Sequence, residues 1–256
     1  MPLARVFRVF LFSLVAISSK SNAFTKVDGG VFIRADRRPQ RTALSDTACS
    51  SASDDGGIRF LGRGDDAIVR PGSVLVSPSF EFDHFLMRSA LFVYAIGEDD
   101  QQGETIIRAV VIDHPTAFEI GEMSPTVTSR LANNTLFRGG YDGTDAVMFL
   151  HSAGGKETTG SEIGCTGIYE GGIASVQKQV DAGLIDPSQC KFFFNYMEFS
   201  LKQLDDMFAT VEDNDFWTSL EIPSEMVLSS EYARGQLWAK LRGIIKRQCG
   251  DAGRNG

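Results

Sequence analysis

Residues 72–97 read GSVLVSPSFEFDHFLMRSALFVYAIG, and this stretch decides the fold class. The apolar residues within 73–77 predict a strand, which Pro78 ends because proline lacks an N–H for the sheet ladder. An aspartate cap predicts a short helix over 84–89. The unbroken apolar run at 90–96 predicts a buried strand. Strands and short helices therefore follow one another closely.

The same signals continue on both sides of this stretch. Further strands are predicted at 105–112, 135–138, 146–150, 167–169, 191–196 and 216–222. Further helices are predicted at 124–131, 173–182, 200–209 and from about Ser230 onward. Residues 50–64 are rich in Ser, Asp and Gly and read as a linker, with order beginning near Ile68. This mixed order predicts a single α+β domain rather than regular βαβ winding.

Three of the helices carry specific local signals. Gly183 ends the helix that begins at 173, and Ser200 with Gln203 forms a capping box at the start of the next. In the last helix an apolar stripe is predicted to face the core and a basic cluster to face solvent. The stripe is Leu237, Leu241, Ile244 and Ile245, and the cluster is Lys240, Arg242, Lys246 and Arg247.

Charge is spread unevenly along the chain. Residues 1–56 carry eight Lys/Arg and five Asp/Glu, which gives +3, whereas residues 57–256 carry seventeen and twenty-eight, which gives −11. A domain at −11 repels a phosphate backbone unless it has a local basic face, so we expect no tight nucleic-acid binding.

The four cysteines indicate neither a zinc site nor a disulfide framework. Cys49, Cys165, Cys190 and Cys249 form no CxxC, and no Cys/His spacing matches a metal centre. We therefore expect no metal, no cofactor and a reducing compartment.

The first sixty residues are predicted to be a targeting sequence. Residues 1–23 have a basic start, an apolar run at 9–18 and a small-residue cleavage site ending at Ala23, the pattern of a signal peptide. Residues 24–60 are predicted to be a transit peptide and linker, because residues 24–53, which begin with Phe24, form a basic stretch with many Ser and Thr. We expect delivery to the plastid stroma of an alga with secondary plastids, with secretion or the endomembrane system as the alternative. No membrane span is expected in the mature protein.

Few residues are candidates for chemistry. His84, His114 and His151 are far apart, and no nucleophile elbow accompanies them, so no catalytic residue is assigned. The glycine pairs Gly139-Gly140 and Gly171-Gly172 offer backbone N–H groups to an anion, and the second pair opens a helix. Tight turns and close packing are the alternative explanation of both pairs.

Several short motifs, in order, resemble the AlgH-like family, which bacteria, plants and algae share. They are Gly72–Pro78, Phe85, Ser89, Asp113-His114-Pro115, Arg138-Gly139-Gly140, Phe149–Ser152, Tyr169–Gly172, and Tyr196 with Gln203-Leu204. The chain departs from the family's Asn-Arg-Pro at Asp113 and His114. It also has Asn195, Glu198 and Phe199 where the family has Gly, Gly and Trp. The resemblance covers about residues 72–247.

The resemblance implies one α+β domain over 68–250, with a mixed, bifurcated sheet curled into a partial barrel and short flanking helices. It implies no reaction and no cofactor. We expect a non-enzymatic regulatory or interaction domain that binds a small anionic ligand or a protein partner. The expected ligand site combines Arg138, Gly139, Gly140, His151, Gly171 and Gly172. The alternatives are a hydrolase or transferase that uses His151, and a transcriptional regulator.

Overall fold

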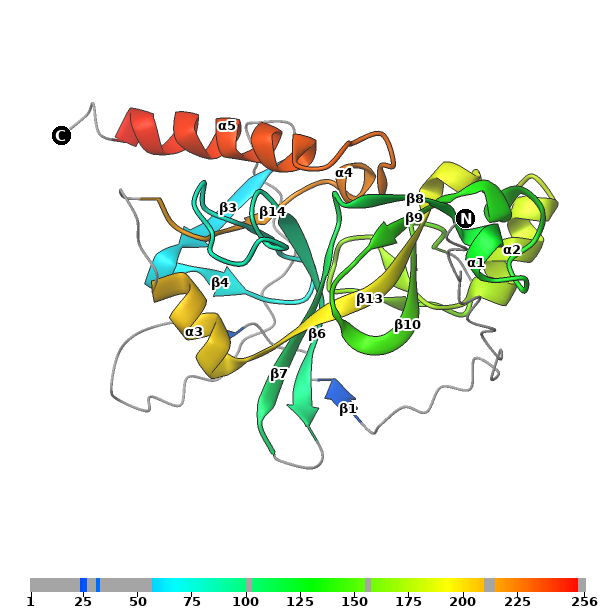
Figure 1. Ribbon diagram of the computed structural model, residues 1–256, viewed down its shortest axis with the longest axis horizontal. Helices are drawn as coiled ribbons and strands as arrows, with labels where there is room; N and C mark the ends of the chain where they lie inside the picture. The colour runs from blue at the N-terminus through cyan, green and yellow to red at the C-terminus, as the bar shows by residue number, and fades with distance from the viewer. Residues whose placement is uncertain are drawn as a thin grey trace, which may run out of the picture.

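The computed structural model describes residues 24–26, 31–32, 57–99, 103–154, 158–209 and 215–252 (Figure 1). Its strands are β1 (Phe24–Lys26), β2 (Val31–Phe32), β3 (Arg59–Arg63), β4 (Ile68–Val69), β5 (Val74–Val76), β6 (Ala90–Asp99), β7 (Thr105–Val111), β8 (Pro115–Glu119), β9 (Thr135–Arg138), β10 (Asp142–His151), β11 (Ser161–Glu162), β12 (Tyr169–Glu170), β13 (Cys190–Ser200) and β14 (Thr218–Glu221). Its helices are α1 (Ile120–Met123), α2 (Ile173–Asp181), α3 (Leu201–Ala209), α4 (Ser224–Leu228) and α5 (Gln236–Ala252), with 3-10 turns η1 (Gly64–Asp66), η2 (Ser129–Asn133) and η3 (Pro187–Gln189).

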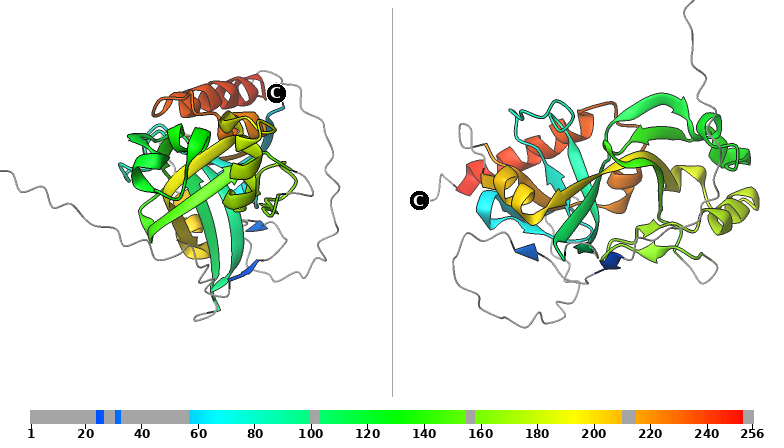
Figure 2. Two further views of the ribbon diagram at one scale, coloured as in Figure 1. Left: turned by 90° about the vertical axis from the view of Figure 1, so that its right-hand side faces the viewer. Right: turned by 60° about the horizontal axis from the view of Figure 1, so that its bottom comes forward.

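Twelve strands form one large sheet in the order β11-β12-β10-β13-β7-β6-β5-β14-β3, from which β1, β8 and β9 branch. The sheet divides along β13 (Figure 2). The first half of β13 pairs with β10 and, in parallel, with β9, whereas its second half pairs with β7. The predicted α+β domain with a mixed, bifurcated sheet is confirmed, and the sheet does not close into a barrel.

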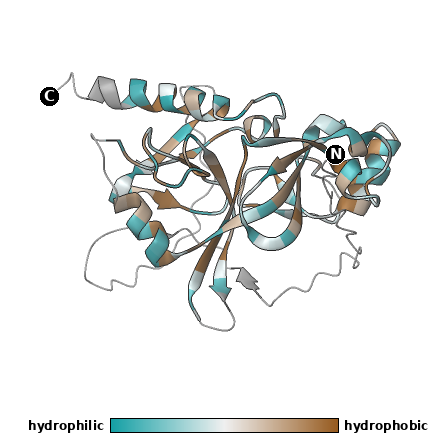
Figure 3. Cartoon of the chain, viewed as in Figure 1, coloured by the Kyte–Doolittle hydropathy of each residue, from teal (hydrophilic) through white to brown (hydrophobic). Residues whose placement is uncertain are grey.

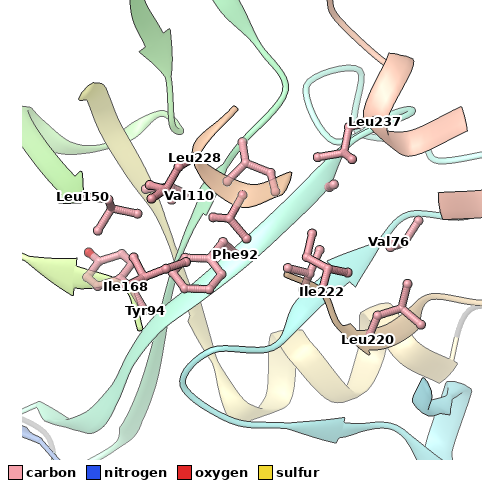
Figure 4. Close-up of a cluster of buried hydrophobic side chains, with 14 of the residues drawn as sticks. Val76, Phe92, Tyr94, Val110, Leu150, Ile168, Leu220, Ile222, Leu228 and Leu237 are labelled. Atoms are coloured by element: carbon pink, nitrogen blue, oxygen red, sulfur yellow. The ribbon is translucent and has the colours of Figure 1, made fainter. Parts of the chain in front are cut away.

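The central strands β5, β6 and β7 are buried on both faces, which explains the apolar run at 90–96. Phe92 and Val110 face one core cluster together with α4 and α5, as the close-up in Figure 4 shows. Leu91 and Val111 face a second cluster, which α3 covers. Hydropathy on the ribbon follows the same arrangement, with apolar strands inside and the polar side of α5 outward (Figure 3). A third cluster lies between α2 and β13.

The local signals for the helices are largely confirmed. α2 ends before Gly183, which has φ +73°, a conformation that glycine adopts at no steric cost. The capping box of α3 is reciprocal, because Gln203 N–H donates to Ser200 Oγ and Ser200 N–H donates to Gln203 Oε1. The predicted apolar stripe of α5 is buried.

Three helix predictions need correction. Residues 84–89 form turns rather than a helix, since Arg88 has φ +58° and interrupts helical geometry. The helix predicted at 124–131 is replaced by α1 and η2, which lie on either side of its first half. The last helix starts at Gln236 rather than near Ser230, and the shorter α4 precedes it.

The sheet begins earlier than the expected start near Ile68. β3 pairs with β14, and its Leu61 is buried, as is Ile58 just before it. The Gly- and Asp-rich composition around β3 had indicated a linker. Residues 50–56 of that predicted linker lie outside the described part of the chain, whereas 59–63 form β3 and Gly64 begins the η1 turn. The strands β1 and β2 pair with β6 and β4.

Arg242 is the exception in the predicted basic cluster of α5. It is buried and ion-paired to Asp215, whereas Lys240, Lys246 and Arg247 are exposed as expected. Among the described residues, no helix is both long and apolar enough to cross a membrane.

Candidate functional site

His151 and the Gly171-Gly172 pair, two of the three predicted site elements, lie together. β10 and β12 pair so that His151 faces Tyr169 across the strands. His151 Nε2 lies 3.1 Å from the Gly171 carbonyl oxygen, to which the neutral ring donates. Gly172 then starts α2 with φ +70°. The chain therefore turns from strand into helix directly over the imidazole.

The surroundings of His151 leave no room for an anion. Its side chain is fully buried and is stacked between the rings of Phe149 and Tyr169, at centroid distances of 5.2 and 5.7 Å. Burial lowers the pKa of His151, while the Gly171 and Ala153 backbone groups act in the opposite direction. The ring is thus held neutral, and its contacts fix the turn before α2.

The Arg138-Gly139-Gly140 segment lies away from His151. Arg138 pairs with Phe194 on the β9 side of β13, whereas His151 pairs with Cys190 on the β10 side. Their partners on β13, Cys190 and Phe194, are four residues apart, which is about 13 Å along the strand. A Cβ atom on Gly139 or Gly140 would collide with the backbone of β13, so this pair serves close packing. The structure therefore does not join all six predicted residues in one site.

Arg138 instead belongs to a second group of side chains. Its guanidinium lies over the ring of Phe85, 4.9 Å from the centroid. The other neighbour of Phe85 is His114, which it meets edge to face at 5.1 Å. His114 Nε2 lies 3.0 Å from Ser89 Oγ, inside the molecule. The order from surface to interior is therefore Arg138, Phe85, His114 and Ser89.

Residues 83–89 form a fixed turn that presents these groups. Asp83 accepts hydrogen bonds from the Phe85 N–H at 2.8 Å and from the Tyr141 hydroxyl at 3.3 Å. Ser89 Oγ donates to the Phe85 carbonyl at 3.0 Å, which closes the turn from its other end. The position of Phe85 is therefore set by the turn itself rather than by a ligand.

Two further arginines lie at this turn, of which Arg88 is part of the turn and Arg234 contacts it. Arg234, just before α5, donates to the His84 carbonyl at 3.2 Å, and Arg88 lies over the ring of Trp238 at 6.0 Å. We call Arg88, Arg138 and Arg234 the arginine face. Within the described part of the chain, none of the three forms an ion pair with a carboxylate.

The arginine face acts on the charge of His114. Burial, and to a smaller extent the positive charges of Arg234 and Arg138, lower the pKa of His114 to about 4. The imidazole is therefore neutral at physiological pH and adds no positive charge of its own. Ser89 is fully buried behind it.

A buried polar network supports this face from below. Asp113 accepts hydrogen bonds from the Ala90 and Trp238 backbone N–H groups, the second in the first turn of α5, and burial raises its pKa to about 6. Lys191 donates to the carbonyls of Ile112, Val227 and Ser229 at 2.7, 3.0 and 2.7 Å. Burial lowers the pKa of Lys191 to about 7, and the negative charge of Asp113 opposes the shift. This network ties α4 and the start of α5 to the sheet.

Exposed aromatic side chains precede the turn in the chain or contact it. Phe80 and Phe82 precede the turn and are 65% and 80% exposed, and Tyr141, which contacts Phe85, is 51% exposed. Aromatic and arginine side chains are the residue types that protein interfaces favour.

The sequence had pointed to some of these residues only. It indicated Arg138 and the Asp113-His114-Pro115 departure. Lys191 was predicted only as the first residue of an apolar strand, with no role of its own. Arg88 and Arg234 carried no motif. Among the described residues, no group of three or more His, Cys, Asp or Glu side chains is placed to hold a metal ion.

The family model of the AlgH-like proteins matches residues 83–248. The chain belongs to the AlgH-like family. Its curated relatives include a UPF0301 protein of Chlorobium limicola, 23% identical over 173 residues, which cover 67% of this chain and 84% of the relative. A UPF0301 protein of Chlorobium luteolum is 29% identical over 131 residues, which cover 51% and 65%.

Two solved structures are also similar to this AlgH-like chain. The AlgH protein of Pseudomonas aeruginosa matches 75% of this chain and 91% of its own, at 16% identity and a TM-score of 0.44. A protein of Corynebacterium diphtheriae matches 70% and 86%, at 17% identity and a TM-score of 0.48. The family is one of uncharacterised function.

One departure from the AlgH-like pattern lies at a left-handed backbone position. Asn195 stands where the family has glycine and has φ +61°, a conformation that asparagine tolerates better than other side chains. Glu198, at the next such position, forms an ion pair with Arg108 beside the ring of Tyr196. Two of the departures from the family pattern thus have a place in this structure, one as a left-handed residue and the other in an ion pair.

Proposed function

We propose that this AlgH-like chain is a non-enzymatic binding domain whose arginine face recognises an acidic segment of a partner protein. One observation carries the proposal: Arg88, Arg138 and Arg234 surround one fixed turn without a carboxylate partner among the described residues. On a chain of net charge −8, such guanidinium groups attract a carboxylate or phosphate and bind it through paired hydrogen bonds.

The exposed aromatic side chains favour a protein over a small anion. Phe80, Phe82 and Tyr141 offer apolar area that a phosphate or a small carboxylate would leave unused. Interface energy concentrates in aromatic and arginine side chains. The same arginines could instead hold a small anionic ligand, and the experiment below distinguishes this ligand from an acidic protein segment.

The burial and hydrogen bonding of Ser89 and His114 support binding rather than catalysis. Ser89 is fully buried and donates its proton to the Phe85 carbonyl, so it does not present a nucleophile to a substrate. Likewise, His151 is stacked between two rings with its Nε2 on a carbonyl. We therefore propose no reaction at either histidine.

The test is quantitative partner capture. Proteins retained by the immobilised chain are identified, and each affinity is measured for wild type, for Arg138→Gln with Arg234→Gln, and for Lys202→Gln. Lys202 is an exposed cation on α3 and serves as the matched control. We expect the double variant to bind at least about tenfold more weakly, with a reduced dependence on salt, because two charge contacts are lost.

The outcomes distinguish the two ligand sources. If millimolar phosphate or citrate binds the arginine face by NMR shifts and no protein is retained specifically, the ligand is a small anion. If a captured partner binds the double variant as tightly as wild type, the arginine face is not the site and the proposal fails.

We further propose that the chain acts in the plastid stroma. Support comes from the signal pattern at 1–23 and from Phe24 at the start of a basic, hydroxyl-rich stretch. A fluorescent protein fused to residues 1–60 should enter the plastid of an alga with secondary plastids. Phe24→Ala should leave it outside, and unchanged import of that variant would contradict the two-part address.

We do not propose direct DNA binding, because residues 57–256 carry a net charge of −11. A sequence-selective mobility shift at physiological salt would revive a regulator of transcription.

A further inference from the structure

A sequence motif at the start of β9 has no part in the arginine face. Residues 133–135 read Asn-Asn-Thr, and no other asparagine of the chain is followed two residues later by Ser or Thr. An Asn-x-Ser/Thr triplet without proline in the middle is the acceptor motif for N-linked glycosylation. Such triplets also occur by chance, so the position of the asparagine in the fold decides whether the motif can act.

Asn133 lies on the surface at the end of η2. Its side chain is exposed, as is that of Arg130 one 3-10 turn earlier on the same side, whereas Leu131 is buried in the core. The described chain is continuous from 103 to 154, so the residues on both sides of the triplet are placed. Among the described residues, none holds the Asn133 carboxamide by a hydrogen bond. The acceptor nitrogen is therefore free to react without any loss of contacts.

Asn134 determines how the triplet is presented. Its side-chain amide donates to the carbonyls of Pro187 and Cys190 at 2.9 and 2.8 Å, which directs this side chain inward. The backbone at Asn134 is extended and leads into β9, so the neighbouring side chains turn away from those carbonyls. Asn133 is thus exposed and Thr135 half-buried beside it. The inward residue is the one that the motif leaves open, and the two that it requires face outward.

We propose that Asn133 is an N-glycosylation site, modified while the chain passes through the endomembrane system. This inference rests on the targeting proposed above, because the sugar donor, a lipid-linked oligosaccharide, is found in that compartment. The carboxamide nitrogen of Asn133 forms a bond to C1 of the first sugar. The bond between C1 and the oxygen of the lipid diphosphate breaks, the lipid diphosphate leaves, and the nitrogen loses one proton.

The position suits a bulky polar group. Asn133 precedes β9, whereas Arg138 is the last residue of that strand, and the three steps from Thr135 to Arg138 span about 10 Å. A glycan would therefore project from the η2 end of β9 rather than from the arginine face. Because Asn133 is exposed, the glycosylated chain and Asn133→Gln should melt at the same temperature as the unmodified chain.

The experiment translates the full chain in the presence of microsomes from the endoplasmic reticulum. Protection from added protease reports entry, and a gel shift that an endoglycosidase reverses reports the glycan. We expect one glycan on wild type and none on Asn133→Gln or Thr135→Ala. Asn134→Gln is the matched control, since it changes the neighbouring amide but keeps the motif, and it should still be modified.

A second version of the chain separates targeting from modification. Residues 1–23 are replaced by the signal peptide of a secreted protein, so that entry no longer depends on the native sequence. If only this version enters and is modified at Asn133, the proposed targeting fails, while the acceptor site is supported. If a chain that has entered carries no glycan, or carries one that persists in Asn133→Gln, the inference is overturned.

Discussion

At the scale of single residues, the three histidines differ in what surrounds them. His84 is exposed, whereas His114 and His151 are buried and held neutral. The sequence placed all three outside any recognisable catalytic motif, and for His114 and His151 the contacts supply a structural role. The burial of the His114 ring could not be predicted from the sequence, because nothing in Asp113-His114-Pro115 shows that Phe85 covers it.

The first prediction concerns pH and His114. Its pKa is about 4 in the folded protein and 6.5 in an unstructured peptide, so between these values the unfolded chain binds more protons. Stability therefore rises with pH across this window and is lost on acidification. Relative to His114→Gln, which can still donate to Ser89, wild type should lose up to about 3 kcal/mol between pH 7 and pH 4.

The measurement is urea unfolding of both proteins at several pH values. Asp113 contributes the opposite slope, because its folded pKa is raised to about 6, but it does so in both proteins and cancels in the difference. A stability difference that does not change with pH would show that His114 titrates normally in the folded protein.

The second prediction concerns His151→Ala. The substitution removes a ring stacked between Phe149 and Tyr169 and leaves the Gly171 carbonyl without its donor. Such a change should cost about 3 kcal/mol of unfolding free energy. Denaturant unfolding checks it, and affinity for partners of the arginine face should be unchanged in the remaining folded protein. If the variant is as stable as wild type but no longer binds the partner, His151 belongs to the binding site and the prediction is wrong.

At the scale of elements, β13 explains why the candidate site could be predicted only in part. Arg138 is the last residue of β9 and His151 is the last residue of β10, and both strands pair with β13, so their sequence positions suggest one site. They lie on opposite flanks of the strand, which only the pairing reveals. Short connections make neighbours of successive strands, but they do not decide which side of a shared strand each one takes.

The helices show the same division between local and tertiary signals. The boundaries of α2 and α3 follow from Gly183 and from the Ser200–Gln203 box, which act within a few residues. By contrast, α4 has five residues and depends on Lys191, far away in sequence, which donates to the carbonyls of Val227 and Ser229 at its end. No window of sequence around α4 contains that partner.

The third prediction follows from this attachment. Lys191→Met should cost at least about 3 kcal/mol, because three buried carbonyl groups lose their donor. Amide hydrogen exchange should rise most in residues 224–229. Lys178→Met, an exposed position on α2, should stay within about 0.5 kcal/mol of wild type. Equal stability of the two variants would show that the carbonyls are satisfied otherwise.

At the scale of the whole molecule, β3 is an edge strand of the large sheet that joins it through β14. Its Leu61 is buried, Ile58 before it is in the main core cluster, and Arg59 forms an ion pair with Glu221 on β14. A chain that starts at Ile58 should stay within about 1 kcal/mol of the full chain. A chain that starts at Asp65 should lose several kcal/mol, because β14 becomes an unpaired edge and the core is opened.

Thermal and denaturant unfolding of the two truncated chains provides the measurement. The short strands β1 and β2 are absent from both chains, so the difference isolates β3 and the residues beside it. If the two truncations are equally stable, β3 is dispensable and the fold begins nearer Ile68.

The pairing of β3 with β14 also has a consequence for the time at which the chain can fold. Arg59 and Glu221 are 162 positions apart. On a ribosome that adds about 5 to 20 residues per second, β3 waits roughly 8 to 30 s for its partner strand to be made. Because β3 joins the sheet only through β14, it has no strand partner in the large sheet during that interval. Protease protection of β3 should therefore appear only after residue 221 has left the exit tunnel, late in the synthesis of the protein.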